Sequence, residues 1–136
     1  MKPEENLEGK RWFNQALRDI DDAKFARDGQ RFNLTCFLAQ QAAEKALKAY
    51  LYAEGSESVW GHSVAELCAD AEVFDKSFGN LRKKAAPLDR YYIPTRYPNG
   101  LPGGIPAEAY QEDDAVKSIN MAEEVIEFVR EKKFLK

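Results

Sequence analysis

The sequence predicts an all-α fold, an antiparallel up-and-down bundle of four main helices plus a short one, with a Pro/Gly-rich loop before the last helix. Apolar residues recur at intervals of three and four along most of the chain, which is the spacing of a buried helix face. No segment shows the alternation of a strand, and no internal repeat appears. A chain of 136 residues has room for one core, so residues 1–136 are expected to form a single domain.

The first two helices have the clearest patterns. Asp28-Gly29 predicts the end of the first helix, because glycine is favoured just after a helix terminus. The second pattern, Phe32 to Glu54, is the strongest in the chain and is followed by Gly55. Several alanines keep this helix thin, so a neighbour can approach closely and we expect it to be central. The residues that define the two faces are Trp12, Ala16, Ile20 and Ala23, then Phe32, Cys36, Ala39, Ala43, Ala46 and Tyr50.

Two further patterns follow. Ser63 can cap a short third helix, with Glu66 completing a capping box. Pro87 interrupts the fourth pattern and is expected to kink or restart the helix, because it lacks a backbone donor. That pattern consists of Phe74, Phe78, Leu81, Ala85, Leu88 and Tyr92.

A loop and a last helix complete the chain. Residues 94–106 hold four of the six prolines, which predicts a loop without regular secondary structure. The last helix has acidic residues in its first turn and basic ones in its last, as the helix dipole favours. Its face is formed by Ala115, Ile119, Ala122, Ile126 and Val129.

Charge is unevenly distributed along the chain. The net charge is −3, which argues against nucleic-acid binding by the surface as a whole. From Lys76 to Pro98, six cations oppose one anion, whereas from Asn99 to Phe128 seven acids oppose one lysine. Such a split is typical of a partner-binding dipole or of two helices that face each other, and we favour the second interpretation.

Composition also predicts where the protein resides and which sites to exclude. No apolar run approaches the roughly 20 residues that cross a membrane, and the polar stretch from Met1 to Lys10 lacks the apolar core of a signal peptide. We therefore expect a cytoplasmic protein. Cys36 and Cys68 lack metal-ligand spacing and are interpreted as reduced core thiols. No metal or cofactor is expected.

Leu88 to Pro98 is the first of three candidate functional stretches. An arginine guanidinium can grip a phosphate with two hydrogen bonds, and a tyrosine ring can stack on a base, so this segment suits a nucleotide or an RNA end. Alternatively, Tyr91 and Tyr92 close the bundle while Arg96 pairs with an acid from Glu112 to Asp114. The candidate binding residues here are Arg90, Tyr92, Arg96 and Tyr97.

The other two stretches are Gln40 to Lys48 and Trp60 to Ser63. Gln41, Lys45 and Lys48 form a polar stripe on the second helix. This stripe is either a solvated face or, given its apolar surroundings, a set of partly buried groups bonded to something. His62 is either a structural hydrogen-bonding group or a weak candidate for a general acid or base.

Taken together, the stretches QQAAEKALKAYL, GHSVAEL and LDRYYIPTRYPNG, in this order after a helix that contains Trp12, resemble a prokaryotic HEPN domain. The resemblance extends from about Trp12 to Val129. It implies a bundle of about five helices that is often homodimeric. It also implies two kinds of role, as the partner of a minimal nucleotidyltransferase in a toxin-antitoxin pair or as a metal-independent ribonuclease with an Arg-x4-6-His motif.

The chain departs from the nuclease pattern of that family. No histidine follows Arg90 or Arg96, and no arginine stands four to six residues before His62. Our leading hypothesis is therefore a non-catalytic homodimer that binds a nucleotide or a nucleotidyltransferase. Two rivals remain: a ribonuclease toxin with a rearranged site, in which His62 acts as base and Arg96 as phosphate clamp, and a helical scaffold.

Overall fold

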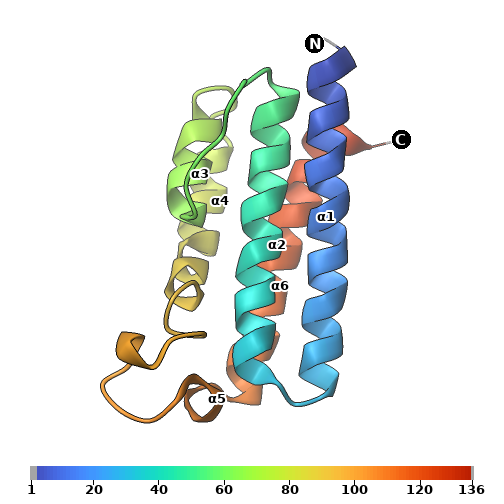
Figure 1. The fold of residues 1–136 in the computed structure, drawn as a ribbon. Coiled ribbons are helices and arrows are strands. Elements are labelled where there is room, and N and C mark those ends of the chain that lie inside the picture. The colour runs from blue at the N-terminus through green and yellow to red at the C-terminus, as the bar shows by residue number, and fades with distance from the viewer. Residues whose placement is uncertain (1–2, 136) are drawn as a thin grey trace.

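The computed structural model describes residues 3–135, and within them the chain is all-helical, as predicted (Figure 1). Three long helices form the body: α1 (Pro3–Asp28), α2 (Phe32–Ala53) and α6 (Glu112–Val129). Two shorter helices, α3 (Val64–Glu72) and α4 (Phe78–Ala85), pack on the side of α2 that faces away from α1. The central position of α2 is therefore confirmed.

Short helical turns join these elements. The 3-10 turn η1 (Ala86–Tyr91) follows α4, and the π-helical turn η3 (Arg130–Phe134) follows α6 and carries the basic residues expected in that helix's last turn. The prediction that residues 94–106 lack regular structure is wrong in part, because η2 (Pro98–Gly100) and α5 (Pro106–Ala109) lie there. Each starts at a proline, whose fixed φ suits the first position of a helix.

One connection departs from a strict up-and-down order. After α2 ends, Glu54–Ser63 runs back along that helix, so α3 starts near the middle of α2 and runs parallel to it (Figure 1). Two hydrogen bonds hold this return: Val59 N donates to the Tyr52 hydroxyl at 3.4 Å, and Gln40 Nε2 donates to the His62 carbonyl at 2.9 Å. The return segment thus places His62 beside the polar stripe of α2.

Small residues bring α1 and α2 together. A Cβ at Gly9 would lie 3.0 Å from the Ala49 carbonyl oxygen, a tight contact that glycine avoids. The end of α1 at Asp28 is as predicted. Cys36 and Cys68 are buried and unpaired, and burial raises the pKa of the first thiol to about 11 and of the second to about 12. Both therefore remain protonated at neutral pH, as expected of core thiols.

The fourth apolar pattern is divided between two elements. The α-helix ends at Ala85 and η1 contains Pro87, which confirms the predicted restart. Phe78 and Leu88 are fully buried, but Phe74 lies in the turn before α4 and is 48% exposed, so its assignment to the buried face is wrong. Phe74 and Phe78 are four residues apart, as two neighbours on one helix face would be, but Phe74 lies in a turn and only Phe78 lies in α4.

Asp89 joins η1 to the start of α3. Ser63 Oγ accepts from Glu66 N at 3.1 Å, as predicted, but among the described hydrogen bonds Glu66 makes no return bond that would complete a capping box. Instead, the Asp89 carboxylate accepts from Val64 N at 2.6 Å and from Ser63 Oγ at 2.7 Å. This cap fixes the segment that leads to Tyr92 against the residue that follows His62.

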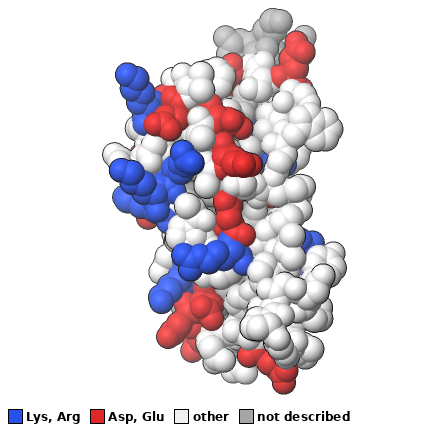
Figure 2. Space-filling view, turned by 90° about the vertical axis from the view of Figure 1, so that its left-hand side faces the viewer, with Lys and Arg blue, Asp and Glu red and all other residues white. Residues whose placement is uncertain are grey.

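The charged segments face each other across helices, in agreement with the favoured interpretation. Lys84 Nζ of α4, in the basic segment, lies 3.1 Å from the Glu124 carboxylate of α6, in the acidic one. The face shown in Figure 2 carries Lys and Arg side chains with acidic ones among them, rather than a uniformly basic surface. Within residues 3–135, no helix combines the length and the apolar character that crossing a membrane requires.

Candidate functional site

The imidazole of His62 lies against a buried carboxylate. His62 Nδ1 is 3.3 Å from Glu44 Oε1 and 3.4 Å from Glu44 Oε2. The histidine side chain is 57% exposed, whereas the Glu44 side chain is 4% exposed. A neutral imidazole that donates from Nδ1 to this carboxylate presents Nε2 as an acceptor. The return segment therefore holds an oriented histidine at the surface.

Glu44 is the centre of a buried polar network on α2. Lys48 Nζ lies 3.1 Å from Glu44 Oε2, and the two side chains are 7% and 4% exposed. Gln40 Nε2 donates to Glu44 Oε1 at 3.2 Å, and Gln41 Nε2 donates to Gln40 Oε1 at 2.7 Å. The interpretation of this stripe as partly buried, bonded groups is thus confirmed. The network thus links the exposed imidazole of His62 to buried groups of α2.

Arg96 lies against aromatic rings. Its Cζ is 4.4 Å from the ring centroid of Phe37, 4.6 Å from that of Tyr92 and 5.0 Å from that of Tyr97. Arg96 Nε donates to the Tyr92 carbonyl at 2.8 Å. Among the described residues Arg96 takes part in no ion pair, so the alternative pairing with an acid from Glu112 to Asp114 does not occur. The exposed guanidinium lies against these rings, with its terminal nitrogens unbonded to any described side chain.

Tyr92 brings His62 and Arg96 together. The His62 and Tyr92 rings stack with centroids 4.8 Å apart and an interplanar angle of 15°. Since Arg96 Cζ is 4.6 Å from the same Tyr92 centroid, it lies at most 9.4 Å from the imidazole centre, the sum of the two distances. Both groups are close enough to contact one nucleotide. We call His62, Tyr92, Arg96 and Phe37 the Arg96 cluster.

Neither of the two candidate lysines belongs to this cluster, and Arg90 does not join it. Lys45 Nζ lies 2.6 Å from Asp19 of α1, and Lys48 lies beneath the surface against Glu44. Arg90 is exposed and makes none of the described hydrogen bonds or ion pairs. Of the predicted residues, the structure therefore gathers His62, Tyr92, Arg96 and Tyr97, with Gln41 at the edge of the network.

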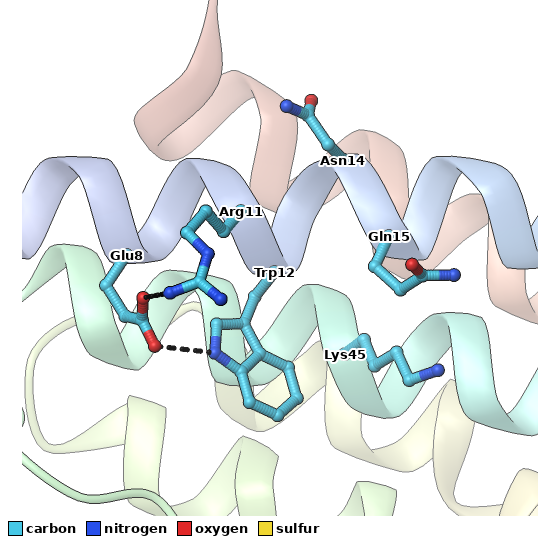
Figure 3. Close-up of a pocket in the computed structure, with 6 residues that line it drawn as sticks. All are labelled: Glu8, Arg11, Trp12, Asn14, Gln15 and Lys45. Atoms are coloured by element: carbon cyan, nitrogen blue, oxygen red, sulfur yellow. Dashed lines mark hydrogen bonds and ion pairs between the residues drawn. The ribbon is translucent and has the colours of Figure 1, made fainter.

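Lys45 lines a separate hollow between α1 and α2 (Figure 3). This open hollow has a volume of about 630 Å³, and Trp12 forms its wall. Glu8 accepts from Arg11 at 2.7 Å and from Trp12 Nε1 at 3.3 Å, as the dashed lines in Figure 3 show. Trp12 also stacks on Tyr52, with centroids 5.6 Å apart. Most polar groups of this hollow already have partners, since Gln15 and Lys45 both donate to Asp19, so it is a weaker ligand site than the Arg96 cluster.

Sequence reasoning missed two residues of the site. Helix spacing indicates Glu44 only as a partner of Lys48, and Phe37 only as an apolar filler, yet they hold His62 and Arg96. Phe37, Gln41, Glu44 and Lys48 recur at steps of four, three and four, so they share one face of α2. This shared face of α2 was the sequence feature from which Phe37 and Glu44 could have been predicted as site residues. The described residues contain no group of three or more His, Cys, Asp or Glu side chains that could hold a metal ion.

Comparison with known proteins agrees with this architecture. The family model of the HEPN domain matches residues 10–132. A relative from Methanocaldococcus jannaschii, named "Putative toxin MJ1304", is 27% identical, and the match covers 93% of this chain and 88% of the relative.

Solved structures give the same result. TT1696 from Thermus thermophilus superposes with a TM-score of 0.82 at 37% identity, over 91% of this chain and 97% of that one. ST0689, an archaeal HEPN homologue, has a TM-score of 0.76 at 35% identity, over 97% and 98% of the two chains. A HEPN domain protein from Thermotoga maritima has a TM-score of 0.70 at 27% identity, over 90% and 96%.

Proposed function

This chain belongs to the HEPN family, and we propose that its Arg96 cluster binds a phosphate of a nucleotide or of an RNA end. One observation carries the proposal: the guanidinium of Arg96 lies against the rings of Phe37 and Tyr92, is exposed, and is outside every described ion pair. A planar guanidinium can donate two parallel hydrogen bonds to a phosphate. Contact with the rings of Phe37 and Tyr92 restricts the guanidinium in advance and reduces the entropy that binding must remove.

Isothermal titration with AMP and ATP tests the proposal. Hydrogen bonds to charged groups contribute about 1.5–3 kcal/mol, so Arg96→Gln is expected to weaken binding by roughly 10- to 150-fold. Arg96→Lys keeps the positive charge but loses the planar pair of donors and the contact of the guanidinium with the rings. We expect its loss of affinity to be intermediate. Arg18→Gln is the matched control, because Arg18 is an exposed arginine of α1 paired with Asp22. Equal affinities of the wild type and Arg96→Gln would refute the site.

We further propose that the protein is one half of a two-gene toxin-antitoxin module and pairs with a minimal nucleotidyltransferase. Family membership and the name of the Methanocaldococcus relative support this role. Co-purification with the product of the neighbouring gene tests it. Recovery of the HEPN chain alone from a co-expression strain would contradict it.

A homodimer is the second partner proposal. Three apolar side chains near the Arg96 cluster, Leu34, Ile93 and Tyr97, are 45–49% exposed and suit a protein contact. Asn33 Nδ2 donates to the Thr95 carbonyl at 3.1 Å, which places the start of α2 beside the segment that carries the other two. Analytical ultracentrifugation of the wild type and of Ile93→Asp is the test, and a wild type that stays monomeric at high concentration would contradict it.

RNA cleavage is a second candidate function, favoured by the contact between His62 and Glu44 next to Arg96. In such a reaction the 2′-oxygen attacks phosphorus while His62 Nε2 takes its proton, and Arg96 stabilises the phosphate charge. The bond to the 5′-oxygen breaks, and that oxygen takes a proton from solvent, which leaves a 2′,3′-cyclic phosphate and a 5′-hydroxyl. Intact RNA after long incubation with the purified protein would exclude this function. Cleavage that disappears in His62→Ala would establish it.

A further inference from the structure

A second open hollow lies between α1 and the C-terminal turn η3, which runs beside the first half of α1 (Figure 1). Its volume is about 680 Å³, within the range of small-molecule pockets. One wall is a single face of α1, because Lys10, Phe13 and Leu17 recur at steps of three and four. The other wall comes from the end of the chain and includes Arg130 and Phe134.

The apolar part of this hollow is built on two stacked phenylalanines. The rings of Phe13 and Phe134 have centroids 4.6 Å apart and an interplanar angle of 19°. Leu135 extends the apolar surface at the rim, where it is 68% exposed. An apolar chain laid along this surface would be removed from water together with it, which is favourable.

All charged side chains that line the hollow are cations. Lys10 is exposed, and none of the ion pairs described for residues 3–135 includes it. Arg130 Nε donates to Glu127 at 3.2 Å, which leaves its terminal nitrogens outside the described hydrogen bonds. Lys133 is already paired with Glu54. Lys10 and Arg130 therefore offer donors to an anion directly beside apolar surface.

The wall formed by η3 is held in place by three other elements. Lys132 Nζ lies 2.9 Å from Asp75 in the turn between α3 and α4, and Lys133 pairs with Glu54 at the end of α2. The stack of Phe134 on α1 is the third contact. A π-helical turn is a rare element that occurs frequently at functional sites. The hollow is thus formed before any ligand arrives.

Four other hollows in the described part of the chain lack this combination, because each is lined by at least one carboxylate. Glu8 lines the hollow of Figure 3, and Glu72 lines one beside α4. Asp21 lines the remaining two. An anion is disfavoured beside these carboxylates, whereas the hollow between α1 and η3 presents it with cations alone.

We propose that this hollow binds an amphipathic monocarboxylate, an aliphatic chain that ends in one carboxylate. The carboxylate accepts from Lys10 and Arg130, and the chain lies along Phe13 and Phe134. The face from Lys10 to Leu17 spans about 10 Å at 1.5 Å per residue, which suits a medium-length chain. No residue of the Arg96 cluster lines the hollow, so this site is independent of the phosphate site proposed above.

Isothermal titration of the full chain with octanoate tests the proposal. Burial of one methylene is worth about 0.8 kcal/mol, so octanoate is expected to bind roughly 15-fold more tightly than hexanoate. Acetate has the carboxylate without the chain, and 1-octanol has the chain without the carboxylate. Both are expected to bind far more weakly than octanoate.

Variants locate the site. Lys10→Glu replaces attraction by repulsion and is expected to weaken octanoate binding roughly ten-fold or more. Lys117→Glu is the matched control, because Lys117 is an exposed lysine of α6 that lies 13 residues, or about 20 Å, along the helix from Arg130. Arg130→Gln, which breaks only the exposed pair with Glu127, is the second variant and is expected to weaken binding roughly ten-fold. A urea curve verifies that each variant is folded.

Four outcomes would overturn the proposal. Equal affinities for octanoate and 1-octanol would show no selection for a carboxylate, and equal affinities for octanoate and acetate would show no use of the apolar surface. Equal effects of Lys10→Glu and Lys117→Glu would place the ligand elsewhere. Co-sedimentation with phosphatidylglycerol vesicles that is lost in Lys10→Glu, without binding of octanoate, would assign this face to a membrane surface. Arg96→Gln is expected to leave octanoate binding unchanged, so the two proposed sites succeed or fail separately.

Discussion

The buried pair of Glu44 and Lys48 offers a quantitative test of the network beneath His62. Their side chains are 4% and 7% exposed, and Lys48 Nζ lies 3.1 Å from Glu44 Oε2. At this separation and an effective dielectric constant of about 20, the Coulomb attraction is about 5 kcal/mol, much of which offsets the desolvation of the two charges. Loss of one partner leaves a buried charge without its counter-ion. Glu44→Gln and Lys48→Met are each expected to lower the free energy of unfolding by about 3 kcal/mol.

The double variant separates this effect from lost packing. Glu44→Gln combined with Lys48→Met removes both charges, so its cost is expected to be smaller than the sum of the single costs by about 2–3 kcal/mol. Urea denaturation followed by circular dichroism gives all four free energies. The control is Lys24→Met, which breaks the exposed pair of Lys24 and Glu123, with side chains 38% and 46% exposed, and is expected to cost less than about 1 kcal/mol. Strictly additive single costs would refute the reasoning.

Three further predictions concern other parts of the fold. Asp89→Ala removes the carboxylate that accepts from Val64 N and Ser63 Oγ at the start of α3, and it is expected to cost about 1–2 kcal/mol of stability in urea denaturation; an unchanged midpoint would contradict this role. The hydrogen bond from Lys132, with smaller effects of two hydrogen bonds from Ser77, lowers the pKa of Asp75 to about 2. Because the folded-state pKa is depressed, this stabilisation is present above about pH 4 and is lost as the pH falls to about 2, so Asp75→Asn should lower the thermal midpoint at neutral pH but not at pH 2. Cys36 and Cys68 are expected to resist a thiol reagent in the folded protein and to react in urea; rapid reaction of the native chain would contradict their burial.

The helices could be predicted because each buries one face. Ala16 and Ile20 of α1, like Ile119 and Ala122 of α6, are buried as their spacing requires. The return of Glu54–Ser63 along α2 could not be predicted, since it has no periodic pattern and is held by two hydrogen bonds across the chain. A parallel α3 therefore had no signal in the sequence.

The candidate site was predictable in its residue types and less so in its grouping. Arg90 and Arg96 are equivalent by composition, but only Arg96 lies on the rings of Phe37 and Tyr92, because the chain bends after η1. Lys45 and Lys48 are three residues apart on one helix, yet Lys45 turns to Asp19 of α1 and Lys48 to a buried carboxylate. Lys45 is oriented by a neighbour from another helix, whereas Lys48 pairs with Glu44 four residues earlier on α2, as the spacing indicated.

The contact between His62 and Glu44 joins residues 18 positions apart, and no local sequence pattern predicts it. What the sequence did contain was the apolar setting of the α2 polar stripe, which indicated buried groups in need of partners. His62 is one of those partners, so the polar stripe of α2 and the histidine before α3 meet at Glu44.

A crystal structure of the protein with AMP bound tests the central claim most directly. Phosphate oxygens are expected to lie within hydrogen-bond distance of the terminal nitrogens of Arg96. AMP bound instead in the hollow lined by Arg11 and Lys45, with Arg96 free of phosphate, would contradict it.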